Sequence, residues 1–157
     1  MKIVAKTDVG MVRESNQDSY TTGELPNGVA WAVVCDGMGG AAGGNVASST
    51  AVKVIAEQIT SSFRPGMSAN SIKNMMVSAI NAANISVYDI SCSNSELYGM
   101  GTTVVCAIVM EHTAYIAHAG DSRAYIVSHG ALTQLTRDHS VVQELVEHGK
   151  ITALEAK

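Results

Sequence analysis

The stretch that decides the fold is Val33-Val34-Cys35-Asp36-Gly37-Met38-Gly39-Gly40, or VVCDGMGG at residues 33–40. Its apolar first half is typical of a buried strand, and that strand ends abruptly in the carboxylate of Asp36. The glycines that follow bring bare backbone beside the carboxylate, because they lack the side chains that would prevent a sharp bend or a close approach. We therefore start from Asp36 as a candidate binding position.

Outward from Asp36, the residue pattern predicts an ordered set of strands and helices. Apolar residues at three- and four-residue spacing predict helices at residues 45–63 and about 71–91, and capping patterns begin further helices at Ser140 and Thr152. β-branched and aromatic runs predict strands at residues 2–7, 18–24, 29–35, 101–111, 113–120, 123–130 and 132–135. Residues 101–111 are apolar at successive positions, which predicts a central strand covered on both faces.

Three strands, two helices and four strands do not form a regular βαβ alternation. That order predicts an α+β fold, with antiparallel sheets and helices layered on them. No linker or internal repeat divides the chain, so residues 1–157 are expected to form a single domain.

Composition narrows the class of protein. The chain has a net charge of −4 and a pI near 5.6, and neither nucleic acid nor a membrane surface is expected to attract it. No apolar run reaches the length of a spanning helix, and the start turns polar too early for a signal peptide. The three cysteines are widely spaced and odd in number, which favours free thiols and a cytoplasmic location.

Four polar clusters lie at the ends of predicted strands, where a packed sheet can bring them together. They are RESNQD (13–18), DGMGG (36–40), GDSR (120–123) and RDHS (137–140). Asp18, Asp36 and Asp121 would repel one another at close range unless cations lay between them. Only oxygen ligands are on offer, so the cluster favours Mg²⁺ or Mn²⁺, with the Gly37 carbonyl as a further ligand.

Arg13 completes this hypothesis, because a guanidinium binds phosphate oxygens in a bidentate manner. Simpler interpretations stand beside it. An Asp-Gly pair after a strand is often only a turn, and Arg13 could pair with Glu14 or Asp8 on the surface.

The motifs R-x-x-N-Q-D, DGMGG, GTT, GDSR and DHS occur here in the order and at the intervals that they have in a known family. The ordered set resembles the metal-dependent protein phosphatases of the PPM family (protein phosphatase 2C), most closely the bacterial serine/threonine phosphatases. The resemblance runs from Lys2 to the last residue. It implies an antiparallel β-sandwich flanked by helices.

The same resemblance implies hydrolysis of phosphoserine or phosphothreonine in proteins, with two Mg²⁺ or Mn²⁺ ions and a third, weaker site. By position, Asp36 matches the aspartate that bridges both ions, Gly37 the residue that lends its carbonyl, and Asp18 the acid that organises the second ion. Arg13 matches the phosphate-binding arginine, and Asp121 matches the aspartate of the third site. Asn16, Thr102 and His139 match supporting positions. The implied partners are phosphorylated proteins and a serine/threonine kinase as signalling counterpart.

The sequence departs from the family pattern in two places. Many bacterial relatives have a histidine after DGMGG as a proposed proton donor, where this chain has Ala41. The chain also ends before two further family aspartates, so it is expected to lack the C-terminal part of the domain. We expect it to bind metal weakly, with an activity that has to be measured, and to self-associate through exposed strand edges.

Two other functions fit parts of the sequence. Residues 37–42 fit the G-x-G-x-x-[GA] pattern of a dinucleotide-binding turn, but Asp36 would then face a pyrophosphate, and Glu57 would lie in mid-helix. A non-catalytic or oligomerising module with the phosphatase fold is the other alternative. Ala41 favours that module, whereas the retention of Arg13, Asp18, Asp36 and Asp121 does not.

Overall fold

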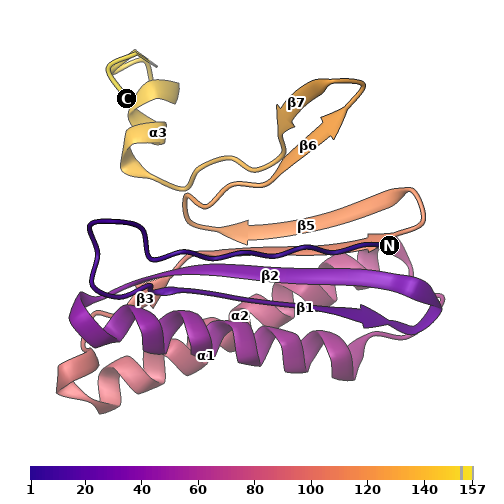
Figure 1. Ribbon diagram of the computed structural model, residues 1–157, viewed down its shortest axis with the longest axis horizontal. Coiled ribbons are helices and arrows are strands. Elements are labelled where there is room, and N and C mark those ends of the chain that lie inside the picture. Colours follow the sequence, from indigo (N-terminus) through magenta and orange to yellow (C-terminus); the bar gives the residue numbers. More distant parts are fainter. Residues whose placement is uncertain (153, 157) are drawn as a thin grey trace.

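The computed structural model describes residues 1–152 and 154–156. Figure 1 shows its main body, in which two long helices cover one face of an antiparallel sheet. The sheet contains β1 (Asp18–Leu25), β2 (Val29–Met38), β4 (Val104–Met110) and β5 (Thr113–Ala119) in that spatial order, and the short β3 (Gly101–Thr102) pairs with β2. The helices are α1 (Gly40–Ser62) and α2 (Ala69–Ser93).

A second, smaller unit follows β5. The strands β6 (Tyr125–Ser128) and β7 (Ala131–Gln134) form a separate hairpin, and α3 (Val141–Glu147) follows it. Figure 1 shows the hairpin and α3 on the side of the sheet opposite α1 and α2. The described sheets are antiparallel throughout, which confirms the α+β fold class.

β1 and β2 form a hairpin whose turn fixes which residues of the two strands lie opposite each other. A tight turn at Pro26–Gly28 connects the strands, with Asn27 and Gly28 at positive φ. Gly23 lies directly opposite Trp31, and the indole covers it so closely that a Cβ there would come within 2.6 Å of the ring nitrogen. The Trp31 side chain is buried, and its indole N–H has no hydrogen-bond partner among the described residues.

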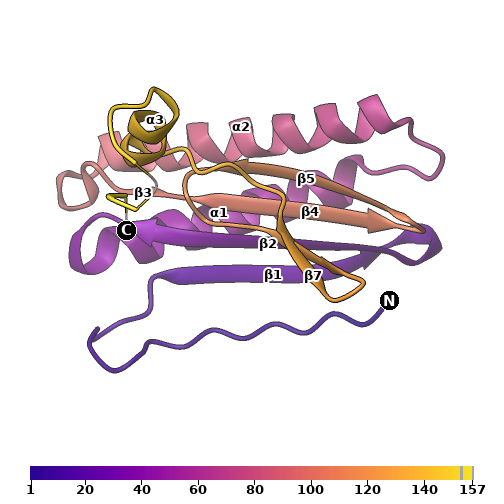
Figure 2. The same ribbon diagram turned by 90° about the horizontal axis from the view of Figure 1, so that it is seen from above.

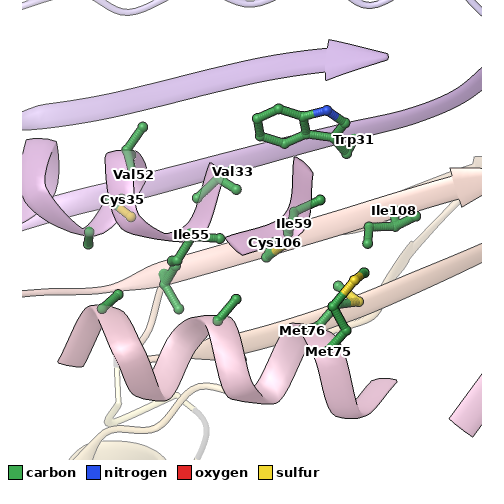
Figure 3. Packing of buried hydrophobic residues seen from close by; sticks show 14 of the residues in the cluster. Trp31, Val33, Cys35, Val52, Ile55, Ile59, Met75, Met76, Cys106 and Ile108 are labelled. Carbon is green, nitrogen blue, oxygen red and sulfur yellow. The ribbon is translucent and has the colours of Figure 1, made fainter. Parts of the chain in front are cut away.

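The core lies between the sheet and the two long helices. Figure 3 shows Val33, Cys35, Cys106 and Ile108 of the strands facing Ile55 and Ile59 of α1 and Met76 of α2. Every one of these side chains is at most 1% exposed. Burial raises the pKa of the Cys35 and Cys106 thiols to about 12 each, so both behave as small apolar groups, as the sequence predicts.

Four predicted elements differ in the structure. Residues 2–7 are exposed and have no strand partner in the described part of the chain, and Figure 2 shows them running along the β1 side of the sheet. A single extended segment gains little from strand geometry without a ladder of hydrogen bonds. α1 begins at Gly40 rather than residue 45, since the glycine run itself turns into the helix.

The third difference lies at residues 152–155. Thr152 and Glu155 make a reciprocal pair of capping hydrogen bonds, but residues 154–156 form a turn and no helix follows within the described residues. The fourth difference lies at residues 101–111, which form β3 and β4 with a break at Thr103 rather than one strand. β4 is central, as predicted, but the helices cover only one of its faces. Val104, Cys106 and Ile108 are buried beneath them, while Val105, Ala107 and Val109 are half-buried on the other side.

Within the residues described here, neither long helix combines the length and the apolar character that crossing a membrane requires.

Candidate metal centre

Asp18 and Asp36 are direct cross-strand partners, the first residue of β1 opposite the eighth residue of β2. Strand alternation places both on the face of the sheet away from α1 and α2, because their β2 neighbours Cys35 and Gly37 are buried against the helices. Both aspartates are exposed. Two carboxylates from segments 18 residues apart therefore share one small region at the end of the sheet.

The charges around Asp36 show which groups lie near it. Its pKa is raised, first by burial of part of the carboxyl and then by the negative charge of Asp18 and a hydrogen bond with it. Arg13 lowers that pKa and Asp121 raises it slightly further. Asp18, Arg13 and Asp121 thus lie within electrostatic reach of Asp36, although the four residues come from three separate stretches of chain.

The backbone of Asp36 is held from both sides. Its N–H donates to Thr103 Oγ1 at 3.0 Å, and its carbonyl accepts from the Thr103 N–H and from Thr102 Oγ1, both at 2.9 Å. Thr103 is buried, and its hydroxyl also hydrogen-bonds that of Ser122 at 2.7 Å. A single threonine therefore connects the Asp36 strand to the loop that carries Asp121.

Gly37 is required by the packing of β2 against the start of α1. A Cβ at Gly37 would lie 1.9 Å from the carbonyl oxygen of Gly44, a distance that no atom pair tolerates. The Gly37 N–H donates to the Gln17 carbonyl at 3.2 Å, and the buried Ser48 hydroxyl donates to the same carbonyl at 2.7 Å. The glycine after Asp36 thus lets the strand, the helix and the segment before Asp18 meet.

The residues before Asp18 are also ordered. Asn16 accepts a hydrogen bond from the Asp18 N–H at 3.0 Å and donates to Thr7 Oγ1 at 2.6 Å. The Gln17 side chain donates to the Gly40 carbonyl at 2.6 Å. Asn16 therefore supports Asp18 in the same way that Thr102 and Thr103 support Asp36.

The DHS segment is attached to the end of β5. The rings of His118 and His139 stack with centroids 4.5 Å apart, and the His118 Nε2–H donates to the Arg137 carbonyl at 2.7 Å. The His139 N–H donates to the Gly120 carbonyl at 3.0 Å. Arg123 makes a bidentate pair with Asp138 rather than with its neighbours Asp121 and Ser122, at distances of 2.9 and 2.6 Å. These contacts fix the loop that contains Asp121.

The donor set fits a hard divalent cation at the Asp18–Asp36 pair. The two carboxylates repel each other, and a cation between them would remove that repulsion with ligand atoms that are all oxygen. Asp121 influences the pair electrostatically, yet nowhere in residues 1–152 or 154–156 do three His, Cys, Asp or Glu side chains group closely enough to hold a metal ion. The side chain of Ala41 lies outside the described residues.

Several contributing residues were not singled out from the sequence. They are Gln17, Ser48, Thr103 and Ser122. Gln17, Thr103 and Ser122 lie inside the motifs quoted above, and that position is the only feature of the sequence that points to them. Ser48 carried none, because a serine inside a helix is common and its partner lies 31 residues away.

The dinucleotide-binding alternative does not fit this topology. β2 leads through α1 into α2 and then into antiparallel strands, so no parallel βαβ unit occurs in the described part of the chain. Glu57 is exposed in the interior of helix α1 and does not stand at the end of a strand in the sequence. A ribose-binding acid is expected at the end of the second strand of such a unit.

Comparison with known proteins gives a consistent result. Residues 12–152 match the family model described as protein phosphatase 2C. A putative protein phosphatase 2C-type from Streptococcus pyogenes is 39% identical over 99% of this chain and 62% of its own length. The serine/threonine phosphatase stp of Listeria monocytogenes is 36% identical over 96% of this chain and 60% of its own length.

Solved structures agree with this match. The Streptococcus agalactiae serine/threonine phosphatase superposes with a TM-score of 0.87 at 34% identity, covering 96% of this chain and 61% of that one. The catalytic domain of the serine/threonine protein phosphatase PstP, in complex with 2 manganese ions, superposes with a TM-score of 0.79 at 34% identity, over 96% of this chain and 61% of that one. The chain thus spans about three-fifths of the length of these relatives. From the fold, the motifs and the family match together, the chain belongs to the protein phosphatase 2C family.

Proposed function

We propose that this protein removes phosphate from phosphoserine and phosphothreonine in proteins, with two Mg²⁺ or Mn²⁺ ions held around Asp18 and Asp36. The observation that carries the proposal is the direct pairing of these two carboxylates across β1 and β2. Relatives at 34–39% identity are named as protein phosphatases of this kind, and one of them was solved with 2 manganese ions. A third, weaker ion is assigned to Asp121.

Asp18 and Asp36 would hold divalent cations that lower the pKa of bound water and so supply hydroxide near neutral pH. The protein's own part is to fix the ligands. Asp36 is held on both sides of its backbone by Thr102 and Thr103, and the Gly37 carbonyl is kept beside it by the contact with Gly44. Ligands that are already in place need no reorganisation during the reaction.

Arg13 is assigned to the phosphate. Its guanidinium is exposed, and its charge acts on Asp36. A guanidinium binds two phosphate oxygens at once and keeps its charge at all physiological pH values. It would therefore orient the phosphate beside the carboxylate pair and offset the negative charge that grows on its oxygens. Since residue 41 is alanine, another group has to supply the proton for the leaving alkoxide, and solvent water, His118 and His139 are the candidates.

We also propose a cellular location, partners and a mode of self-association for this protein. The three cysteines are free, which supports a reducing, cytoplasmic location. The chain is proposed to act as one domain, on phosphoproteins made by a serine/threonine kinase. The outer edges of β1 and β5 have no strand partner among the described residues, and these edges are where self-association through strand pairing would occur.

Calorimetry with Mn²⁺ and an assay with a phosphothreonine peptide test the proposal together. Asp36→Asn should remove Mn²⁺ binding and any Mn²⁺-dependent phosphate release. Asp89→Asn serves as the matched control, because Asp89 is an exposed aspartate on α2, and it should bind Mn²⁺ as the unmodified chain does.

The outcomes separate the two functions that remain. Mn²⁺ binding with peptide hydrolysis supports the phosphatase. Mn²⁺ binding that is equal in Asp36→Asn and the unmodified chain would contradict the assignment of the site. A folded chain that binds no Mn²⁺ at millimolar concentration would instead favour the non-catalytic module.

A further inference from the structure

A pocket of about 420 Å³ lies on the helix side of the sheet, behind the carboxylate pair. Its floor is made by small and aliphatic side chains of both long helices and of β4, among them Ala51, Ile55, Ala83 and Val104. The alanines create the hollow, because larger residues at these positions would fill the space between the helices. We name this space the α1–α2 pocket.

The rim of the α1–α2 pocket is unusually apolar for a surface. Met38, Tyr88 and Tyr98 line it and are 58%, 67% and 80% exposed. Large exposed apolar side chains that gather around a cavity mark a binding site more often than isolated ones do. The volume also falls within the range of about 300–1,000 Å³ that is common for small-molecule sites.

The polar groups of the pocket indicate what kind of ligand it would take. Every lining residue in the described chain is uncharged. Asn84, Tyr88 and Cys92 follow each other at four-residue spacing, so they form one row along α2 at the rim. Ser91 is already occupied, since it donates to the Leu97 carbonyl and accepts from the Gly99 N–H. A neutral, largely apolar molecule with one hydrogen-bonding end fits this lining.

One wall of the pocket is the strand pair that holds Asp36. Gly101 and Thr102 of β3 and Met38 of β2 line it, and Thr102 Oγ1 donates to the Asp36 carbonyl at 2.9 Å. β3 has only two residues, paired with Gly37 and Met38. Figure 1 shows β3 at the end of the sheet where α1 begins. Because Thr102 and Thr103 hydrogen-bond both the N–H and the carbonyl of Asp36, a ligand that moves β3 moves the backbone of Asp36 with it.

We propose that the α1–α2 pocket binds a neutral apolar small molecule, and that its occupation is transmitted through β3 to Asp36. The binding of a ligand in the pocket does not depend on the proposed function. The effect of that ligand on metal affinity rests on the proposed function, because it requires that Asp18 and Asp36 bind a cation. A ligand against Thr102 changes the backbone position of Asp36, and so changes the affinity of the carboxylate pair for a divalent cation. By thermodynamic linkage, the cation must change the affinity for the ligand by the same factor.

The probe for this test is N-phenyl-1-naphthylamine, which is neutral, apolar and carries one N–H. Its fluorescence should rise saturably with the metal-free chain. Asn84→Phe places a ring at the rim and should weaken binding at least tenfold. Asn74→Phe is the matched control, an exposed asparagine of α2 that lines no described pocket, and it should bind the probe normally. Equal binding by both variants would overturn the site.

The reactivity of the Cys92 thiol provides a second test, which uses the unmodified chain and so does not depend on the folding of a variant. Cys92 is exposed at the rim, whereas Cys35 and Cys106 are fully buried. Saturating probe should slow the reaction of Cys92 with iodoacetamide several-fold. An unchanged rate would place the probe elsewhere and contradict the proposal.

The effect of the bound probe on Asp36 can be measured from backbone amide signals in NMR spectra. This measurement requires neither a metal ion nor enzymatic activity. Adding the probe should shift the amide signals of Asp36, Thr102 and Thr103, while those of Tyr125 to Ser128 in β6 stay in place. Shifts confined to α1 and α2 would overturn the transmission.

With Mn²⁺ present, the probe should change the Mn²⁺ dissociation constant at least threefold. Probe binding with these amide shifts in a chain that binds no Mn²⁺ would contradict the proposed function and support the pocket.

Discussion

Asp18 lies directly opposite Asp36 across the β1–β2 hairpin, and the pKa of the Asp36 carboxyl is raised, first by its partial burial and then by the charge of Asp18. Like charges at opposed positions destabilise a strand pair. The metal-free chain therefore keeps two repelling carboxylates, Asp18 and Asp36, at the end of its first hairpin. Removing one of these charges should change the stability of the chain by a measurable amount.

The first prediction concerns removal of one charge. Asp18→Asn should raise the stability of the metal-free chain by roughly 0.2–1 kcal/mol, because the cross-strand repulsion is gone. The same variant should lose most of its Mn²⁺ affinity. Thermal unfolding in EDTA and calorimetry with Mn²⁺ measure the two effects.

Glu24→Gln is the control for that variant. Glu24 lies on the same face of β1, but its partner is Ala30, so its neutralisation removes no opposed charge. If Asp18→Asn were no more stable than Glu24→Gln, the repulsion between the carboxylates would be too small to matter.

A second prediction is the pH dependence of the metal-free chain. Because the pKa of Asp36 is raised from 3.8, the folded chain holds that proton more tightly than the unfolded chain. This contribution to stability is fully present below pH 3.8 and is lost as the pH rises through the folded pKa. The difference in melting temperature between the unmodified chain and Asp36→Asn should follow that course between pH 3.5 and 6.5 in EDTA. Mn²⁺ affinity should rise with pH over the same window, since the cation needs the deprotonated carboxylate.

Arg13 sets where that window lies. Its charge lowers the pKa of Asp36, so Arg13→Ala should move the rise in Mn²⁺ affinity to higher pH. A profile that stays in place would show that Arg13 does not act on the carboxylate in solution.

The third prediction tests the backbone support of Asp36. Thr103→Val removes the acceptor of the Asp36 N–H and leaves Ser122 without its partner, inside a buried region. An unsatisfied buried group costs about 1–3 kcal/mol, and Asp36 should also bind Mn²⁺ more weakly. Thr103→Ser keeps the hydroxyl and should retain most of the metal affinity. Urea unfolding and calorimetry check both, and equal Mn²⁺ affinity in Thr103→Val and Thr103→Ser would rule out the positioning role.

The fourth prediction concerns Gly37. Gly37→Ala would put a methyl group 1.9 Å from the Gly44 carbonyl oxygen, and neither backbone can move without displacing α1. We expect a loss at or above the upper end of about 1–3 kcal/mol. Gly101→Ala is the control, because its methyl group would meet Met38 at an ordinary 3.5 Å. Chemical denaturation should show a loss in the first variant alone.

The fifth prediction concerns the ion pair in the loop. Arg123 lowers the pKa of Asp138, so the pair adds stability above the ordinary pKa of 3.8, and that stability is lost as the pH falls through the lowered value. Asp138→Asn should be less stable by up to about 1 kcal/mol at pH 7 and equal to the unmodified chain near pH 2. Melting curves at several pH values measure this, and a difference that persists at the lowest pH would point to lost packing instead.

Much of the fold could be predicted because it follows from local pattern. The strand at 29–35 and the helices near 45–63 and 71–91 show clear periodicities, and all three exist. The pairing of Asp18 with Asp36 also follows from the turn. Once Leu25 pairs with Val29, each step outward along the hairpin leads to these two aspartates.

Other features depend on contacts that sequence pattern does not contain. Residues 2–7 have the composition of a strand, but a strand exists only where a partner accepts its hydrogen bonds. The pairing of Arg123 with Asp138 does not follow from the sequence either, because the two residues are 15 positions apart and Asp121 lies much nearer to Arg123 along the chain. Thr103 was missed because its hydroxyl acts on a backbone amide 67 residues away.

The enclosed indole of Trp31 has a practical consequence. It is the only tryptophan of the chain, and it lies over Gly23 at the centre of the first hairpin. Its ultraviolet emission should be shifted toward short wavelength in the native state and toward long wavelength once water reaches the ring. A spectrometer with no added dye can therefore follow the opening of this one hairpin, separately from helix content measured by circular dichroism.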